Sequence, residues 1–470
     1  MSGALFRPLL EGAPQRAELV EQTVGLHKQH YFDYTASGLA YEPIEARIRE
    51  VLQTYANTHS KEAAMASLTG SYYEAARQNL AISLGLDEHF VILPAGCGST
   101  KAIKRFQELL GLYIPPATRK RYGIEVDGSS LPLVVVGPYE HHSNEVSYRE
   151  ALCDTVRIGL TSEGLIDLEH LERVLEANKG REIIGSFCVA SNVSGMITPY
   201  EAISTLLRRY GAVVCFDAAA SSPYMNVPCE LYDAMFLSPH KLLGGPGSCG
   251  LLLIRRSLID ATLPPSFAGG GTVSYVNATQ QRYDSNVEAR EDAGTPGILQ
   301  LIRASLAYQL RNEIGFAWIK ERKEGLLARL RSGLEAIEGC EIYGNADAPN
   351  IGIVSFNIAG RDPYELCRRL SAQFGVQTRA GCSCAGPYGH DLLGADSEEE
   401  LGENPGWLRI SVHFSQSEEE IDFLIESLKR SLGSSGGSDV PGEGSGLPLK
   451  EKTLGWKSWG RLRRLLSRVG

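Results

Sequence analysis

The chain has 470 residues, of which 43% are hydrophobic and 22% charged, and it carries a formal net charge of −10. This length allows two or three domains, and the composition is that of a globular protein. The acidic balance argues against a general nucleic-acid binder. No apolar run approaches the roughly 20 residues of a membrane span, and the first residues lack the apolar core of a secretory signal. The ten cysteines are scattered, which indicates reduced thiols and predicts a cytoplasmic protein.

The N-terminal region is expected to form an arm followed by helices. Residues 15–30 are polar and compatible with a helix, and we assign residues 1–30 to the arm. Residues 31–38 predict a short strand that leads into a turn of small residues. Apolar positions at helical spacing then predict helices over 43–55 and 71–84.

A glycine-rich turn after the next strand resembles an anion cradle. Residues 90–93 predict a strand, and the turn over 96–100 leads into a helix over 101–110. The free N–H groups and the dipole of a helix N-terminus favour phosphate, and Ser99 and Thr100 would add their hydroxyl groups. The alternative is that these hydroxyl residues only cap the helix.

Apolar strands that alternate with helices form the middle of the chain. Such strands indicate a mainly parallel sheet with helices on both faces, in which ligands bind at the carboxyl ends of the strands. Four polar residues fall at such strand ends: His141, Asn192, Asp217 and Lys241. Four polar groups at successive strand ends predict a binding site.

Lys241 is the most informative of these residues, because it lies between two apolar strands, at 234–237 and 250–254. A desolvated lysine has a lowered pKa, and its neutral amine can form a Schiff base. Ser238 and His240 flank it as hydrogen-bonding groups for an anionic ligand. The alternative is a lysine at a strand end that extends to water.

The C-terminal part predicts a smaller α+β domain. A long helical stretch over 296–334 joins it to the large domain, and its expected elements are strands at 351–358, 376–378 and 408–412 and helices at 363–374 and 418–432. The loop from 379 to 406 is long for a compact domain, which favours a function or a mobile cover.

These patterns divide the chain into five segments: an arm (1–30), a large domain (31–300), a small domain (301–432), a linker (433–449) and a basic tail (450–470). The linker is rich in glycine and serine and is expected to be flexible. The tail is basic, with apolar residues near helical spacing. It could dock on a membrane surface or a partner, or remain disordered.

The quoted residues resemble a known family, the pyridoxal-phosphate (PLP) enzymes of aminotransferase class V, over residues 31–432. Within that family the chain is most similar to cysteine desulfurases and selenocysteine lyases of the second group, and the resemblance implies the PLP fold type I. The motifs that carry it are Glu140-His141-His142-Ser143-Asn144, Ser191-Asn192-Val193-Ser194-Gly195, Ser238-Pro239-His240-Lys241, Gly294-Thr295-Pro296 and Arg379-Ala380-Gly381-Cys382-Ser383-Cys384.

The resemblance implies PLP as the cofactor and gives each residue a role. Lys241 would hold PLP as a Schiff base and move the α-proton, and Asp217 would pair with the ring nitrogen. His141 would stack on the ring and take part in proton transfer, and Asn192 would contact the ring oxygen or the substrate. The phosphate would be bound by Ser99, Thr100, Ser238, His240 and a partner subunit's residue equivalent to Thr295, which implies a homodimer.

The resemblance also implies the substrate side of the site. Arg379 and Arg409 would grip the carboxylate of cysteine or selenocysteine, and His59 would lie at the entrance. Cys384 would attack the substrate sulfur, which leaves a persulfide on the enzyme and releases alanine. The sulfur would pass to an acceptor protein, and we assign no metal ligand.

The chain departs from the family pattern at two places. Ala220 stands where a glutamine usually contacts the ring oxygen, and Cys382-Ser383 stand where two histidines more often precede the nucleophile. Cys382 could be a second thiol for relay or only a small substitute. The rival functions are a class V aminotransferase, a C–S lyase on another amino acid, and a scaffold without catalysis.

Overall fold

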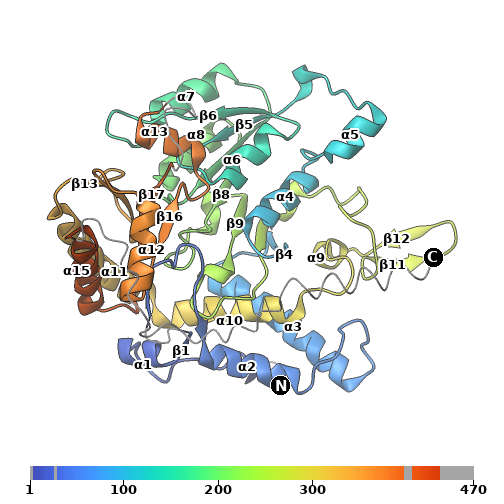
Figure 1. Cartoon of the computed structure of the whole chain (residues 1–470). Helices are drawn as coiled ribbons and strands as arrows, with labels where there is room; N and C mark the ends of the chain where they lie inside the picture. Colours follow the sequence, from blue (N-terminus) through green and yellow to red (C-terminus); the bar gives the residue numbers. More distant parts are fainter. Residues whose placement is uncertain (1–3, 26–28, 396–404, 434–470) are drawn as a thin grey trace, which may run out of the picture.

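The computed structural model describes residues 4–25, 29–395 and 405–433 (Figure 1). Its centre is a seven-stranded sheet in the order β4-β10-β9-β8-β7-β5-β6. The strands from β9 to β6 in this order run parallel, and β10 is antiparallel to both β4 and β9. The mainly parallel sheet is therefore confirmed. The strands are β4 (Phe90–Pro94), β5 (Leu133–Val136), β6 (Asp154–Arg157), β7 (Ile183–Cys188), β8 (Val213–Asp217), β9 (Ala234–Leu237) and β10 (Leu251–Arg255).

Helices cover both faces of this sheet, because its central strands are apolar on both sides. Val134, Cys215 and Phe236 belong to the apolar cluster under α4 (Ser99–Leu109) and α6 (His142–Arg149). Their neighbours in sequence pack on the opposite face in a larger cluster. The helices that contribute to the larger cluster are α2 (Glu42–Leu52), α3 (Ala64–Leu84), α7 (Leu168–Ala177), α8 (Tyr200–Arg209) and α10 (Ile298–Ile314).

A second, antiparallel sheet of four strands lies beside the first, in the order β13-β14-β17-β16 (Figure 1). Three helices pack with it around a separate apolar core. The elements are β13 (Cys340–Ile342), β14 (Ile353–Ile358), β16 (Arg379–Gly381), β17 (Trp407–Ser411), α11 (Phe316–Glu335), α12 (Pro363–Phe374) and α15 (Glu418–Gly433). A smaller α+β part is therefore present, and the exact domain bounds stay a prediction.

Three details of this part differ from the sequence-based expectation. The helical stretch over 296–334 is two helices, because Gly315 has a φ of 85° and ends α10. The strand expected over 376–378 is β15 (Val376–Gln377), which pairs with β2 (His30–Tyr31) of the N-terminal region. The expected long loop begins with β16 and contains helix α13 (Gly386–Leu393).

The remaining elements are short: α1 (Arg16–Glu21), β1 (Thr23–Val24), β3 (Ala40–Tyr41), α5 (Pro116–Tyr122), β11 (Val273–Val276), β12 (Gln281–Tyr283) and α9 (Val287–Arg290). Nearly all of the predicted linker (433–449) and the whole tail (450–470) lie outside the described residues. Within the described ranges, no helix combines the length and hydropathy needed to cross a bilayer.

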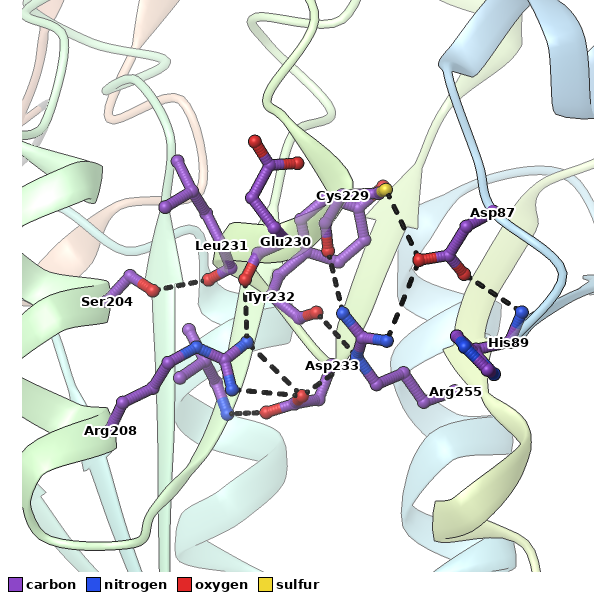
Figure 2. A network of polar contacts seen from close by, with 11 residues as sticks. Asp87, His89, Ser204, Arg208, Cys229, Glu230, Leu231, Tyr232, Asp233 and Arg255 are labelled. Atoms are coloured by element: carbon purple, nitrogen blue, oxygen red, sulfur yellow. Dashed lines mark hydrogen bonds and ion pairs between the residues drawn. The ribbon is translucent and has the colours of Figure 1, made fainter.

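A network of ion pairs fixes the start of β9, the strand whose other end leads to Lys241 (Figure 2). Asp233 directly precedes β9, and its carboxylate accepts a 2.9 Å hydrogen bond from the Val214 N–H of β8. The same carboxylate lies 3.3 Å from an Arg208 nitrogen and 3.2 Å from Arg255 Nε. One side chain therefore ties β9 to β8, α8 and β10.

We expect Asp233→Ala to lower the free energy of unfolding by about 2 kcal/mol, because it leaves the Val214 N–H without its acceptor and removes a carboxylate that pairs with two guanidinium groups. Denaturant unfolding followed by circular dichroism measures this change. The matched control is Glu172→Ala, which removes an exposed ion pair with Arg209 and should change the stability by less than about 0.5 kcal/mol. Equal effects of the two substitutions would contradict the assigned role.

Candidate active site

A cavity of about 240 Å³ lies at the carboxyl ends of the parallel strands. It brings together the predicted site residues with two exceptions, His59 and Thr295. Small residues, among them Thr35, Ala36 and Ala220, complete the wall. The predicted residues that line the cavity are Ser99, Thr100, His141, Asn192, Asp217, Ser238, His240, Lys241, Arg379, Cys384 and Arg409.

Lys241 ends a short 3₁₀ turn that directly follows β9. Burial lowers the pKa of its amine to about 8, although the charge of Asp217 acts in the opposite direction. A hydrogen bond from the N-terminal region also holds this turn, since the Gly38 N–H donates to the His240 carbonyl at 2.9 Å. A Cβ atom at Gly38 would lie 2.0 Å from the Leu242 carbonyl oxygen, so only glycine permits this approach. The lysine is thus fixed, and its amine is suited to condense with an aldehyde.

Asp217 is the last residue of β8 and is buried at the bottom of the cavity. Its carboxylate accepts a 2.9 Å hydrogen bond from the Ala219 N–H, and burial raises its pKa. A carboxylate that is buried in this way gains stability from a protonated ring nitrogen beside it.

Glu140 supports this part of the site from behind, a role that the sequence analysis missed. It is 1% exposed and accepts hydrogen bonds from the Cys188 N–H at 2.8 Å and from Asn144 Nδ2 at 2.7 Å. Burial raises its pKa to about 8. Its place shortly after the buried strand β5 and next to His141 in the sequence was the available signal.

His141 is held as a neutral ring. The Ser143 N–H donates to His141 Nδ1 at 3.1 Å, so the ring proton lies on Nε2. Burial, together with the charge of Lys241, lowers the pKa of His141 to about 4. A neutral imidazole can stack on a flat ring and exchange a proton at Nε2 without carrying a charge at neutral pH.

The predicted anion cradle is a narrow pocket at the N-terminus of α4. The Ser99 N–H donates to Ser238 Oγ at 2.9 Å, which joins the two strand ends that form the cradle. A Cβ atom at Gly98 would lie 3.1 Å from His240 Cε1 and 3.2 Å from Ser238 Oγ. Glycine therefore keeps the cradle open, and its hydroxyl groups and helix N-terminus fit a phosphate.

Two arginines meet at one carboxylate on the opposite side of the cavity. Arg409 donates to Asp33 Oδ1 at 2.8 Å and to the Asn192 carbonyl at 3.1 Å, and Arg379 lies 3.7 Å from Asp33 Oδ2. Arg409 Nε is buried and has no hydrogen-bond partner in the described part of the chain. The guanidinium pair therefore has donor capacity left for a second carboxylate, which fits the predicted substrate contact. The pairing with Asp33 was not foreseen.

Cys384 lies in a strained and well-anchored turn. Ser383 and Cys384 have φ values of 54° and 57°, and among the described residues they are the only non-glycine residues with positive φ. Asn192 Nδ2 donates to the Ser383 carbonyl and the His142 N–H donates to the Cys384 carbonyl, each at 2.8 Å. His142 Nε2 also accepts from the Gly386 N–H at 2.7 Å.

These contacts keep the exposed Cys384 thiol at the edge of the cavity in a backbone conformation that costs about 1–3 kcal/mol per residue. The turn over residues 383–386 is thus held by contacts with Asn192 and His142, and whether the loop moves as a cover stays a prediction. The second histidine of the motif, His142, holds the turn in place through these hydrogen bonds. Its position in the sequence alone did not indicate this role.

His59 and Thr295 lie elsewhere in the same chain. His59 lines a second cavity of about 320 Å³ together with Gly271 and Gly294. Thr295 Oγ1 accepts a 3.0 Å hydrogen bond from Asn57 Nδ2. The expected entrance position of His59 is thus not found within one chain, and the contribution of Thr295 to a partner's site stays a prediction.

The fold and the residues around the cavity define an enzyme of the PLP-dependent, fold type I class. A family model narrows this class, because the model of the family "Aminotransferase class-V" matches residues 30–424. The chain belongs to that family.

Its relatives include proteins described as cysteine desulfurases. A probable cysteine desulfurase of Staphylococcus epidermidis is 27% identical over 426 residues, which cover 88% of this chain and 94% of the relative. One from Streptomyces coelicolor is 26% identical and covers 86% and 92%. The fold matches the apo structure of a cysteine desulfurase from Thermococcus onnurineus with a TM-score of 0.74 and 24% identity, over 89% of this chain and 99% of that one. The cysteine desulfurase CsdA of Escherichia coli matches with a TM-score of 0.71, also at 24% identity, over 90% and 99%.

Proposed function

We propose that this protein is a PLP-dependent cysteine desulfurase that removes sulfur, or selenium, from cysteine or selenocysteine and leaves alanine. The observation that carries the proposal is the joint presence of Lys241, Asp217 and Cys384 around one cavity with a pair of arginines. An aminotransferase would need the lysine and the carboxylate but not a thiol at the edge of the cavity.

PLP supplies an electron-accepting ring that weakens bonds around the α-carbon of an amino acid. The phosphate would be held by Ser99, Thr100, Ser238 and His240, and the ring nitrogen by Asp217. Lys241 would hold the aldehyde carbon and, once released, carry the α-proton. Its lowered pKa supports this role, since an amine with a pKa of about 8 accepts and returns a proton near neutral pH.

Arg409 and Arg379 would bind the substrate carboxylate, and the substrate sulfur would then face Cys384. The Cys384 thiolate attacks that sulfur, so that a new S–S bond forms on the enzyme. The bond between this sulfur and the substrate β-carbon breaks, and its electron pair stays on the β-carbon. The β-carbon then takes up a proton to give alanine. An acceptor thiolate then attacks the outer sulfur of this persulfide, the S–S bond to the enzyme breaks, and Cys384 leaves as a thiolate while the acceptor carries the persulfide.

We also propose a homodimer, in which Thr295 and His59 reach the partner's cavity, and a cytoplasmic location. The dimer is supported by the position of His59 and Thr295, which lie near a second cavity and not at the active-site cavity of their own chain. Analytical ultracentrifugation tests the dimer, for which a sedimenting mass of twice 51.1 kDa is expected.

Product analysis tests the proposed function and separates it from its rivals. Purified protein with cysteine and a thiol reductant should release alanine and sulfide in equal amounts. Pyruvate would indicate a C–S lyase, and 3-mercaptopyruvate formed only with a keto-acid acceptor of the amino group would indicate an aminotransferase. A panel of amino acids that includes selenocysteine identifies the preferred substrate.

Arg409→Lys should raise the KM for cysteine by about 10–100-fold, because an ammonium replaces a planar group that can form two parallel hydrogen bonds. The kcat should change much less, since the substrate carboxylate lies away from the reacting bonds. Steady-state kinetics of alanine formation measure both values. A fall in kcat at unchanged KM would contradict a role in carboxylate binding.

The pH dependence of cofactor uptake should follow Lys241. Only the neutral amine attacks an aldehyde, and burial places the pKa of this amine at about 8 instead of its usual 10.5. The rate at which the cofactor-free protein takes up PLP should therefore rise between pH 7 and pH 9 and level off above, as followed by absorbance. A rate that keeps rising beyond pH 9.5 would show an ordinary lysine and contradict the assignment.

A further inference from the structure

A hollow of about 670 Å³ is lined by α11, by residues 346–351 and by residues of the large domain, and it shares no lining residue with the active-site cavity. One face of α11 forms one wall, with side chains three or four residues apart. Those side chains are Phe316, Ile319, Lys323, Leu327 and Arg331, and the opposite wall consists of Ile197, Tyr224, Met225, Pro349 and Ile351. The hollow is therefore largely apolar.

Lys323 is the unusual residue of this hollow, since it is only 5% exposed. Its amine donates to the Val412 carbonyl and lies 3.4 Å from the centre of the Tyr224 ring. Among the described residues it forms no ion pair with a carboxylate. An ammonium group has three N–H donors, and here only one of them has a hydrogen-bond acceptor.

The titratable groups that face this amine carry no charge to balance it. Burial raises the pKa of Tyr224, and burial together with Lys323 lowers the pKa of His413 well below its usual value, so both rings are neutral. On the same helix, Lys320 and Glu324 are exposed and pair with each other at 3.8 Å. Burial accordingly lowers the pKa of Lys323 well below its usual value.

A second cation of the hollow also has unused donor capacity. Arg331 donates to the Ala346 carbonyl, but its Nε is buried without a hydrogen-bond partner. The acidic side chains of the lining, Glu324 and Asp347, are exposed at the rim. The interior of the hollow thus combines apolar walls with basic side chains that have no buried acidic partner among the described residues.

We propose that this hollow binds a small amphipathic carboxylate, a ligand with one carboxylate group and an apolar body. Its carboxylate would pair with Lys323, and its body would lie against Ile319, Leu327 and Ile351. A neutral ligand would leave the buried amine without a counter-charge, and a cation would be repelled by the lining. A single negative charge on an apolar body meets both requirements.

The hollow is connected to the arginine pair through one stretch of backbone. Val412, which accepts the hydrogen bond from Lys323, directly follows β17, the strand that carries Arg409. The next residue, His413, stacks on Tyr34 with ring centroids 3.9 Å apart, beside the Asp33 that pairs with Arg409. A ligand that pairs with Lys323 would therefore act, through the hydrogen bond from Lys323 to Val412, on the segment that carries Arg409.

Calorimetric titration of the full-length protein with octanoate tests the proposal without any need for turnover, so its outcome is independent of the proposed function. We expect binding at one site and a net uptake of protons, because a carboxylate beside Lys323 raises the lowered pKa of its amine. Titrations in two buffers of different ionisation enthalpy measure this uptake. Octanol, the neutral counterpart, should bind at least ~10-fold more weakly.

Two variants and one control assign the binding to the hollow. Lys323→Met should weaken octanoate binding at least ~10-fold and remove the proton uptake. Leu327→Trp should block binding by filling the hollow while Lys323 remains. Lys179→Met, which alters an exposed lysine paired with Glu176, should bind octanoate as the wild type does.

The proposal is overturned if octanoate does not bind the wild type, if octanol binds as tightly as octanoate, or if binding is unchanged in Leu327→Trp. If Lys323→Met does not fold, octanoate binding to Leu327→Trp alone tests the proposal.

Discussion

Lys241→Ala should lower alanine formation from cysteine by at least ~10³-fold, because Lys241 is the only lysine of the described residues that lines the active-site cavity. The same substitution should abolish the covalent labelling of the protein when it is reduced with borohydride in the presence of PLP. Absorbance, product analysis and peptide mass spectrometry measure these effects.

Lys101→Ala is the matched control, since Lys101 directly follows Thr100 on α4 but does not line the cavity. It should retain both activity and labelling. A Lys241→Ala protein that still turns over cysteine would contradict the proposed role, and so would a borohydride label on a different lysine in the wild type.

Cys384→Ala should abolish the release of both sulfide and alanine, again by roughly 10³-fold, while leaving the attachment of PLP to Lys241 intact. The reason is that the thiol at the edge of the cavity is the proposed acceptor of the substrate sulfur. A combined assay of alanine, sulfide and PLP absorbance separates loss of chemistry from loss of cofactor.

Cys382→Ala serves as the comparison, because Cys382 belongs to the same turn but does not line the cavity. If alanine formation persists in Cys382→Ala and only sulfur transfer to an external thiol declines, then Cys382 relays the persulfide. Alanine formation that persists in Cys384→Ala at the wild-type rate would instead favour a lyase or an aminotransferase.

The central sheet and the cavity-forming strand ends could be predicted because they depend on local patterns. Apolar strands separated by helices place their carboxyl ends along one edge, and the polar residues after β7, β8 and β9 meet there. The roles of Cys384 and Arg409 came from the resemblance to a family, because no local pattern separates them from ordinary loop and strand residues.

The contacts that complete the site could not be predicted, because they join residues far apart in the chain. Asp33 reaches Arg409 across 376 residues, and the His142 ring accepts a hydrogen bond from Gly386 across 244. Helix α13, in contrast, could have been predicted from its sequence. Pro387 falls in its first turn and Gly394, with a φ of 62°, follows its end.

The central claim is that sulfur passes from the substrate to Cys384, and isotope labelling tests it most directly. The protein would react with cysteine carrying a heavy sulfur isotope, be blocked with an alkylating reagent and be analysed by peptide mass spectrometry. We predict a labelled persulfide on the peptide that contains Cys384, in step with alanine release. Alanine formation with no label at Cys384, or with label only at Cys97 or Cys382, would contradict the account.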